Sequence, residues 1–341
     1  MLVFVAVLFV VSCQNENDID IPKEIQKTEK GIYVLNEGIW GNNNSSISYV
    51  GYDSNKIIFD ITSEKWGGRK LGDTGNSFYE KNDTVYVCVT SSNKIELFRK
   101  SSGEFIRTIT FPQNTEPRNS VISNGKLFVT SFLLASVVVV DLKTFQQANK
   151  IVVGDHPDQL IEKSGKLLIS VSALGSGNKI AIVDAETETK VKDITVGLNP
   201  SEILEVPNFI IIHCTGSLLI ENPRSIYYRL SKTDFSVIDS FVVGKQIFQL
   251  GNYGSFKIFA VDDNQISLMN EDLSVEATLI SRKQIHSKII YSALYDSESG
   301  ILWIASTDTY TVRGWLEGFK DGSKVYGPFQ VGVNPGDLLV K

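Results

Sequence analysis

The chain has 341 residues and a formal net charge of -6, with 42% hydrophobic and 21% charged residues. This acidic balance, without a run of Lys or Arg, excludes the basic surface that nucleic-acid binding requires. The length alone would suggest about two domains, but an uninterrupted repeat over 31–341 predicts a single one.

The N-terminus begins with an apolar run, "MLVFVAVLFVVSC", that ends in the small residue Ser12 directly before Cys13. The run is too short to span a bilayer and is typical of a secretory signal. It resembles a bacterial lipobox, which implies a lipidated Cys13 and stable anchoring to a membrane through several acyl chains. A buried apolar strand and an uncleaved anchor are the alternatives.

Residues 14–30, "QNENDIDIPKEIQKTEK", are polar and lack an apolar period. We interpret them as a flexible tether. The chain therefore divides into a signal peptide over 1–13, the tether over 14–30 and a repeat domain over 31–341.

The repeat domain contains a recurring element in which Val-Gly, two loop residues, Pro and an apolar run follow one another. The best copies are "VGDHPDQLI" from Val153, "VGLNPSEIL" from Val196 and "VGVNPGDLL" from Val331. Degenerate copies begin at Leu71, Phe111, Val242 and Ile280. Seven copies at a step of roughly 44 residues are typical of a propeller or a solenoid.

Each repeat contains four short β-branched runs separated by Gly, Asn, Asp and Ser turns. In one repeat they read "DQLIEKSG", "KLLISVSAL", "NKIAIVDAE" and "KVKDITVGL". Alternating runs of this length indicate strands, and four antiparallel strands per unit form a propeller blade. The sequence predicts an all-β fold, a seven-bladed β-propeller of four-stranded antiparallel blades.

The two ends of the repeat domain complement each other. "GIYVLNEG" at 31–38 matches a second strand, whereas "NPGDLLVK" at 334–341 matches a first strand that no blade follows. We expect the C-terminal strand to close the first blade, because this pairing satisfies strand edges that would otherwise template aggregation.

Residues with catalytic chemistry are scarce. Cys88 and Cys214 fall in strands of the second and fifth blades, too far apart for a disulfide, and are predicted to be buried thiols. His213 lies within a strand and is expected in the core, whereas His156 and His286 lie on inter-blade loops, where they could meet a ligand.

The sequence contains no HExxH, CxxC or GxSxG motif. The adjacent carboxylates of "VDDNQ" at 261–265 are insufficient evidence for Ca²⁺. The predicted inner strands supply polar residues too scattered for the metal centre of a lactonase or hydrolase propeller: Asp73, Asn76, Asn119, Asp158 and Asp337. We therefore predict a protein that is not an enzyme and requires no cofactor and no metal.

Propeller topology predicts where a ligand binds. Loops between the second and third strands of a blade emerge on the same face as the loops that join successive blades. The long and aromatic loops belong to these two classes, such as "NEGIWGNNNSS", "KWGGRKLGDTGN" and "STDTYTVRG". Aromatic and Arg side chains on loops are typical of recognition sites.

We predict that Trp40 and Trp66 point to one mouth and anchor a ligand there, with packing against a blade as the alternative for each residue. The candidate ligand-binding residues are Trp40, Asn42, Asn44, Trp66, Arg69, Asp73, Asn93, Arg118, Phe132, His156, Leu174, Tyr310 and Arg313.

The repeated "VxxNP" element with strands that end in "VD" resembles the YncE-like seven-bladed propellers over 31–341. More narrowly, "GIYVLNEGIWGNNNSSISYV" and "LGDTGNSFYEKNDTVYVCVTSSNKIELF" are similar to propeller lipoproteins of the Bacteroidetes cell surface. That group includes the cobalamin-capturing proteins that cap a TonB-dependent vitamin B12 transporter. The resemblance implies a lipid-anchored, surface-exposed outer-membrane protein that binds cobalamin and has such a transporter as its partner.

Three functions remain open at this point. The first is corrinoid capture for an outer-membrane transporter. The second is a surface propeller that binds a protein or a glycan without corrinoid contact. The third is an enzyme of the lactonase or hydrolase kind.

Overall fold

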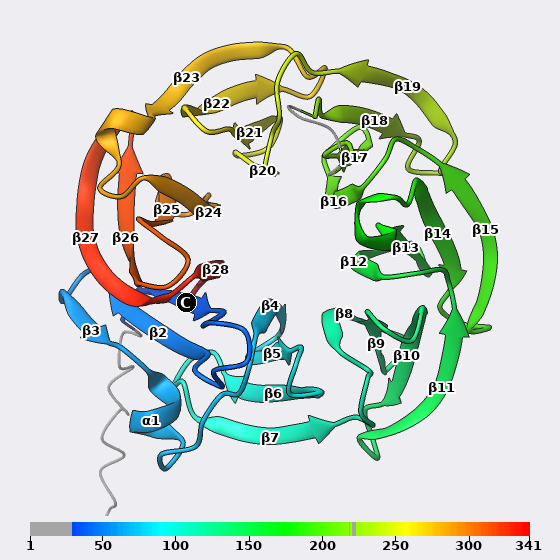
Figure 1. The fold of residues 1–341 in the computed structure, drawn as a ribbon, viewed down its shortest axis with the longest axis horizontal. Coiled ribbons are helices and arrows are strands. Elements are labelled where there is room, and N and C mark those ends of the chain that lie inside the picture. The colour runs from blue at the N-terminus through cyan, green and yellow to red at the C-terminus, as the bar shows by residue number, and fades with distance from the viewer. Residues whose placement is uncertain (1–28, 218, 220–222) are drawn as a thin grey trace, which may run out of the picture.

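The computed structural model describes residues 29–217, 219 and 223–341. These residues form a ring of seven four-stranded antiparallel sheets around a central axis (Figure 1). The predicted seven-bladed, almost entirely β architecture is confirmed. The predicted signal peptide with Cys13, and nearly all of the tether, lie outside the described residues.

The strands of each blade are given from the central axis outward. Blade 1 consists of β28 (Pro335–Val340), β1 (Ile32–Asn36), β2 (Ser46–Gly51) and β3 (Lys56–Ile58). Blade 2 consists of β4 (Gly75–Lys81), β5 (Thr84–Val89), β6 (Lys94–Arg99) and β7 (Phe105–Thr110). Blade 3 consists of β8 (Pro117–Ser123), β9 (Lys126–Ser131), β10 (Ser136–Asp141) and β11 (Gln146–Val152). Blade 4 consists of β12 (Pro157–Lys163), β13 (Lys166–Val171), β14 (Lys179–Asp184) and β15 (Thr189–Thr195).

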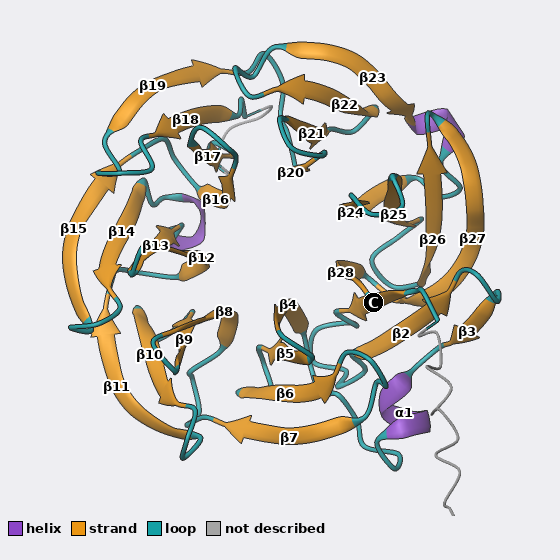
Figure 2. Ribbon diagram, turned by 180° about the vertical axis from the view of Figure 1, so that it is seen from behind, coloured by secondary structure: helices purple, strands orange, loops and turns teal. Residues whose placement is uncertain are grey.

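Blade 5 consists of β16 (Pro200–Glu205), β17 (Ile210–Cys214), β18 (Ile226–Leu230) and β19 (Val237–Val242). Blade 6 consists of β20 (Gln249–Asn252), β21 (Lys257–Val261), β22 (Gln265–Asn270) and β23 (Val275–Ser281). Blade 7 consists of β24 (Ile289–Asp296), β25 (Ile301–Thr307), β26 (Arg313–Lys320) and β27 (Ser323–Val333). A short helix, α1 (Ile61–Lys65), and the 3-10 turns η1 (Ala173–Gly175) and η2 (Arg282–Gln284) lie in connections (Figure 2).

The ring closes through its two chain ends, as the sequence predicts. Strand β28 pairs antiparallel with β1, with Val34 opposite Leu338, and the Lys341 amide donates to the Gly31 carbonyl at 2.8 Å. Closure pairs the innermost edge of blade 1, which would otherwise expose unpaired backbone groups.

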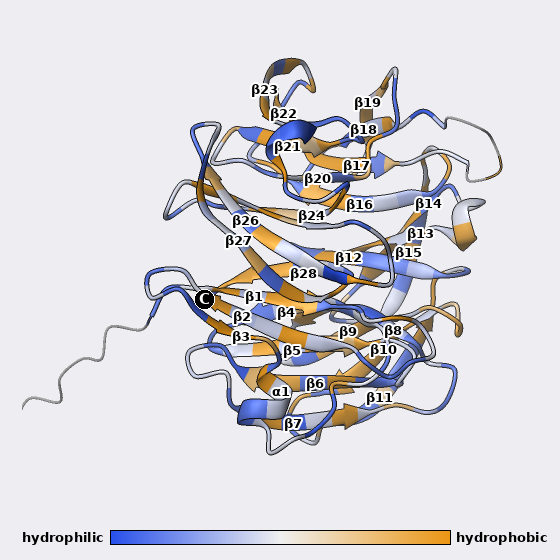
Figure 3. Cartoon of the chain, turned by 60° about the vertical axis from the view of Figure 1, so that its left-hand side comes forward, coloured by the Kyte–Doolittle hydropathy of each residue, from blue (hydrophilic) through white to orange (hydrophobic). Residues whose placement is uncertain are grey.

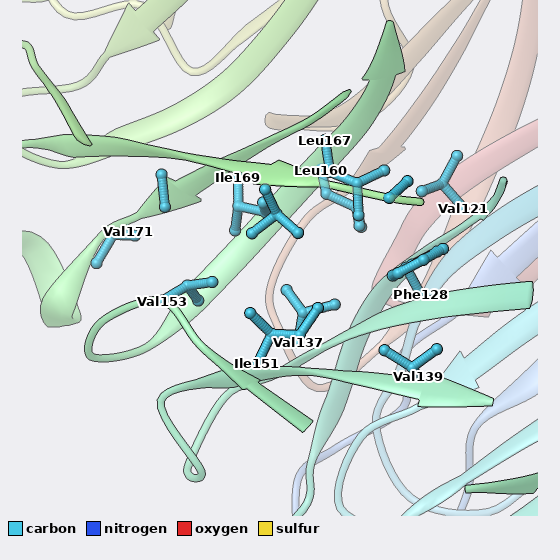
Figure 4. Packing of buried hydrophobic residues seen from close by; sticks show 13 residues of the cluster. Val121, Phe128, Val137, Val139, Ile151, Val153, Leu160, Leu167, Ile169 and Val171 are labelled. Atoms are coloured by element: carbon cyan, nitrogen blue, oxygen red, sulfur yellow. The ribbon is translucent and has the colours of Figure 1, made fainter. Parts of the chain in front are cut away.

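The hydrophobic core lies between neighbouring blades. In one cluster Phe128 and Val137 of blade 3 pack against Leu160 and Ile169 of blade 4 (Figure 4). Alternate residues of each strand face one of the two neighbouring sheets, so every blade seals the next.

Cys88 and Cys214 are buried in such clusters and are not joined to each other. Burial raises the pKa of both thiols to about 12, which makes them inert. The prediction of two buried, unpaired thiols is confirmed.

The connections define two faces of the ring. The loop face consists of the second-to-third-strand loops and the inter-blade loops: 37–45, 59–74, 90–93, 111–116, 132–135, 153–156, 172–178, 196–199, 215–217, 219, 223–225, 243–248, 262–264, 282–288, 308–312 and 334. The turn face consists of 29–31, 52–55, 82–83, 100–104, 124–125, 142–145, 164–165, 185–188, 206–209, 231–236, 253–256, 271–274, 297–300, 321–322 and 341.

The described chain begins on the turn face. Strand β1 runs from the turn face to the loop face, and the Lys30 ammonium pairs with Glu298 of a turn-face connection at 2.7 Å. The C-terminus lies on the same side of the ring (Figure 3). A segment that precedes residue 29 therefore joins the propeller opposite the loop face.

The recurring Asn-Pro has a conformational cause. The residue that precedes the inner strand has positive φ in five repeats, at Thr74, Glu116, His156, Asn199 and Asn334. Asn tolerates this left-handed conformation better than most residues. The Asn334 amide also donates to the carbonyls of Gly38 at 2.8 Å and Tyr310 at 3.0 Å, so it ties two neighbouring loops together.

Candidate functional site on the loop face

Large apolar side chains are exposed mainly on one face of the ring. Among the described residues, the turn face exposes one, Phe256, and the remainder outside the loop face lie on outer strands. Those exposed on the loop face are Trp40, Phe59, Leu133, Leu174, Leu198, Leu219, Phe248, Tyr310 and Val312. Single exposed apolar residues are ordinary, but a set gathered on one face marks an interaction surface.

We define the mouth as the loop-face ends of the inner strands. A recurring bulge shapes it. Six inner strands shift register near their first residues, so that one or two residues there lack a partner on the second strand. Bulges re-aim side chains and are common next to binding sites. The first unpaired residues are Asn76, Arg118, Asp158, Ser201, Tyr291 and Gly336.

An ion pair joins two of these residues across blades 3 and 4. Arg118 donates from Nε and Nη2 to the Asp158 carboxylate at 3.2 and 3.3 Å. The guanidinium also lies 5.1 Å from the centre of the Phe132 ring, whose edge meets His156 at 4.6 Å between centroids. Burial lowers the pKa of Arg118, but the neighbouring Asp158 outweighs that effect and raises it, so Arg118 is charged.

A second polar pair lies across blades 1 and 7. The Tyr291 hydroxyl donates to Glu37 Oε2 at 2.8 Å, and burial raises the pKa of Glu37. A Cβ at Gly336 would clash with Glu37 Oε1, so Glu37 occupies the space that a side chain at this position would take. The mouth therefore contains hydrogen-bond donors and acceptors from several blades.

The next polar position of the inner strands has a structural role. A side-chain oxygen there accepts a backbone amide from the following blade. The pairs are Asp337 with Phe78 at 2.7 Å, Gln159 with Ile203 at 3.1 Å, Glu202 with Leu250 at 2.8 Å and Gln249 with Ala293 at 2.8 Å. Burial raises the pKa of Asp337 to about 6. These contacts explain polar residues in inner strands without a ligand.

Two predicted site residues do not belong to the mouth. Trp66 is buried against Phe98 and Phe105, and its Nε1 donates to the Gly103 carbonyl of a turn-face connection at 2.8 Å. Arg69 lies over the same Phe105 ring at 4.3 Å. The prediction that Trp66 is exposed beside Trp40 is wrong, because α1 and the residues after it fold down along blade 2.

Three predicted polar residues hold the loops themselves. Asn44 accepts the Ile39 amide at 2.8 Å, Asp73 the Gly41 amide at 2.9 Å and Asn93 the Glu116 amide at 3.0 Å. They shape the loop face through backbone contacts.

The remaining predicted residues lie on the loop face or at its edge. Trp40, Leu174 and Tyr310 are 81%, 64% and 60% exposed, and Asn42 is also exposed. Arg313 is the first residue of β26, and its guanidinium lies 5.0 Å from the centre of the Phe59 ring at the edge of the loop face. The structure brings Arg118, Phe132 and His156 into one cluster, to which Asp158 belongs as well.

The other candidate residues have structural partners. His213 is buried between Glu202 at 2.8 Å and Ser225 at 3.1 Å, as expected of a core residue. His286 contacts the Trp315 ring at 4.5 Å between centroids. Asp262 pairs with Lys245 and accepts the amides of Asn264 and Gln265, which accounts for one of the adjacent carboxylates.

Sequence reasoning did not single out Glu37, Phe248 and Tyr291 as site residues. Tyr291 occupies the position of Arg118 and Asp158 in its own repeat, and Phe248 stands one residue before β20, so aligning the degenerate repeats by their inner strands would have found both. Glu37 directly follows β1, and no sequence pattern there distinguishes it as a residue of the mouth.

Within 29–217, 219 and 223–341, no group of three or more His, Cys, Asp or Glu residues lies close enough together to hold a metal ion. In the same residues, no helix has the length and apolar character to cross a membrane.

Similar solved structures share the fold. A quinonprotein alcohol dehydrogenase-like protein from Bacteroides thetaiotaomicron is 14% identical, with a TM-score of 0.66 over 92% of this chain and 78% of its own. A chain of the mitotic checkpoint complex is also 14% identical, with a TM-score of 0.57 over 90% of this chain and 97% of its own. A chain of the Kuenenia stuttgartiensis hydrazine synthase is 14% identical, with a TM-score of 0.56 over 69% of this chain and 73% of its own.

No protein-family model and no curated protein sequence matches the chain. At these identities the similarity to solved structures extends to the fold alone. The class is a seven-bladed β-propeller with one loop-rich, partly apolar face, a fold that can bind ligands or proteins.

Proposed function

We propose that this protein is a non-catalytic capture protein whose loop face binds a corrinoid such as cobalamin. The observation that carries the proposal is the contrast between the two faces: exposed apolar side chains gather around a polar mouth on the loop face, whereas among the described residues the turn face exposes Phe256 alone. Such a surface suits a large ligand that is itself both apolar and rich in hydrogen-bonding groups.

A corrinoid has these properties. It is a flat amphipathic macrocycle with amide arms and a nucleotide tail. Its amides would exchange hydrogen bonds with mouth residues such as Asn76, Asp158 and Tyr291, while its ring would cover apolar side chains such as Leu133 and Leu174. Capture requires complementary surface and satisfied amides but no bond making.

The position of the chain entry fits a tethered protein. Lipidated at Cys13, the chain would be anchored to the outer membrane through residues 14–28 and would join the propeller on the turn face. The loop face would then be free to receive a ligand and to hand it to a TonB-dependent transporter. The resemblance to YncE-like propellers and to Bacteroidetes surface lipoproteins supports this setting.

Protein binding is the second candidate. The observation that favours it is the exposure of single apolar side chains on loops around the mouth, with Trp40 at 81% and Leu219 at 93%. Large side chains that project from loops commonly serve as anchors in a partner's pockets. Under this alternative the partner is a surface protein or glycan and no corrinoid is bound.

Size-exclusion chromatography of the full chain mixed with cyanocobalamin separates the two candidates. Corrinoid capture predicts that the colour of the ligand co-elutes with the protein and that its visible spectrum shifts. A ligand that elutes entirely apart from the protein would contradict the proposal.

A further inference from the structure

A cavity of about 330 Å³ opens on the loop face between blades 6 and 7. Phe248 and Asp263 line it from blade 6, and Lys288, Ile290, Tyr291 and Tyr310 line it from blade 7. Because the Tyr291 hydroxyl also bonds Glu37 at 2.8 Å, the cavity adjoins the mouth.

The walls of this cavity are aromatic and accessible. Phe248 is 45% exposed and Tyr310 is 60% exposed, and the Tyr310 ring meets Tyr291 edge to face at 6.1 Å between centroids. Other exposed aromatic residues, such as Trp40, Phe59 and Phe256, do not line this cavity, whereas Phe248 and Tyr310 both do. Exposed rings around a concavity favour a flat ring as the ligand, because stacked and edge-to-face contacts add to the area buried.

The rim of the cavity carries both signs of charge. The Lys288 side chain is exposed, and its backbone is held at both ends, since its amide donates to Asp308 at 3.1 Å and its carbonyl accepts from Arg282 at 2.5 Å. Asp262 is occupied by Lys245 and by two turn amides, but the neighbouring Asp263 is exposed. The rim therefore offers an ammonium donor and a carboxylate acceptor.

We infer that this cavity binds a nucleotide, with its base against Phe248 and Tyr310, its ribose hydroxyls donating to Asp263 and its phosphate accepting from Lys288. A nucleotide combines a flat ring, hydroxyl donors and an anion, which match the aromatic side chains, the carboxylate and the ammonium group of this cavity. The inference rests on the proposed function, under which the nucleotide is the tail of the corrinoid. A free nucleotide has the same chemistry.

Calorimetric titration of the full chain with cyanocobalamin and with dicyanocobinamide, which lacks the nucleotide, tests the inference. Wild type should bind cobalamin about thirtyfold more tightly, the ratio that one hot-spot interaction supplies. The double variant Phe248→Ala and Tyr310→Ala should lose that preference and keep its cobinamide affinity within about twofold. Phe256→Ala on the turn face is the control and should keep the wild-type ratio.

Equal affinity of wild type for the two corrinoids would overturn the nucleotide site while leaving corrinoid capture intact. If neither corrinoid binds, the proposed function has failed, and 5,6-dimethylbenzimidazole riboside phosphate then decides the nucleotide site. Saturation transfer from wild type to the base protons, absent with the double variant, would support it. No transfer to wild type would overturn it.

Discussion

The two faces of the ring connect the same strands but use different sequences to do so. Several turn-face connections are two-residue hairpins, such as Asn124-Gly125 and Ser164-Gly165, in which both residues have positive φ. Two-residue turns of this kind match the twist of antiparallel strands. The loop face connects strands through longer segments, such as 37–45 and 59–74, that carry side chains the hairpins do not need. The longer segments carry side chains that hold the loops, such as Asn44 and Asp73, beside exposed side chains available for binding, such as Trp40.

The largest effect is expected from breaking the ring itself. Deletion of 334–341 removes β28, together with the Asp337 contact to Phe78 and the closure of blade 1. Unfolding free energy should fall by about 5 kcal/mol or more, the scale of a whole domain's stability. Thermal unfolding is the measurement, and an unchanged midpoint would mean that β28 does not support the ring.

Sequence analysis places Trp40 and Trp66 at one mouth, but their substitution should affect the stability of the protein to different extents. Trp66→Ala removes a buried ring and the hydrogen bond to Gly103, so the unfolding free energy should fall by about 3–5 kcal/mol. Trp40→Ala should change the unfolding free energy by less than about 0.5 kcal/mol, because Trp40 is 81% exposed. Denaturant titration of both variants checks this, and similar losses would remove the distinction between them.

A substitution on the loop face should weaken ligand binding, whereas a substitution on the turn face should not. Arg118→Ala leaves Asp158 unpaired at the mouth and removes the cation from Phe132, so cyanocobalamin affinity should fall by about 2 kcal/mol. Phe256→Ala should change the affinity by less than about 0.5 kcal/mol. Calorimetric titration is the measurement, and equal losses in the two variants would contradict a one-sided binding face.

A smaller, pH-dependent effect is expected at Asp337. Since the folded pKa of about 6 lies above the ordinary carboxyl value, the folded state keeps a proton that the unfolded state has lost. Stability should therefore fall as the pH rises from about 4 to about 6 and remain lower above that range. Asp337→Asn removes this loss, and Gln159 and Gln249 already make the same contact with amides.

The Asp337→Asn variant should be more stable than wild type by about 1 kcal/mol at pH 7, because the side chain of Asp337 is only partly buried and the burial cost is reduced, and equally stable near pH 4. Chemical unfolding at both pH values checks this. A variant that gains the same stability at both would show that Asp337 does not titrate in this range.

The fold could be predicted from the sequence because its determinants are local. Alternating strands, Gly and Asn turns and the element before each inner strand repeat with the blade, so blade count and closure follow from the repeat. The division into two faces also follows, since strand order determines where each connection emerges.

Much of the site could not be predicted, because it depends on contacts between blades. Trp66 is buried by Gly103 of a turn-face connection and by Phe105, the first residue of β7, both in the next blade. Asp73 lies in an inter-blade loop, and its carboxylate accepts the Gly41 amide of the 37–45 loop, a contact that neither segment's sequence reveals. The cavity lined by Phe248 and Tyr291 lies between two of the three repeats whose inner strand does not begin with Pro, where the register is hardest to assign.

The central claim is that the loop face binds a corrinoid, and paired titrations of the full chain with cyanocobalamin test it most directly. A triple variant, Trp40→Ala, Leu174→Ala and Tyr310→Ala, changes three exposed loop-face residues, and Phe256→Ala changes the turn face. The account predicts that the triple variant loses at least about 100-fold in affinity at unchanged thermal stability, whereas Phe256→Ala binds as wild type does. Wild-type affinity in the triple variant, or no binding by wild type, would contradict it.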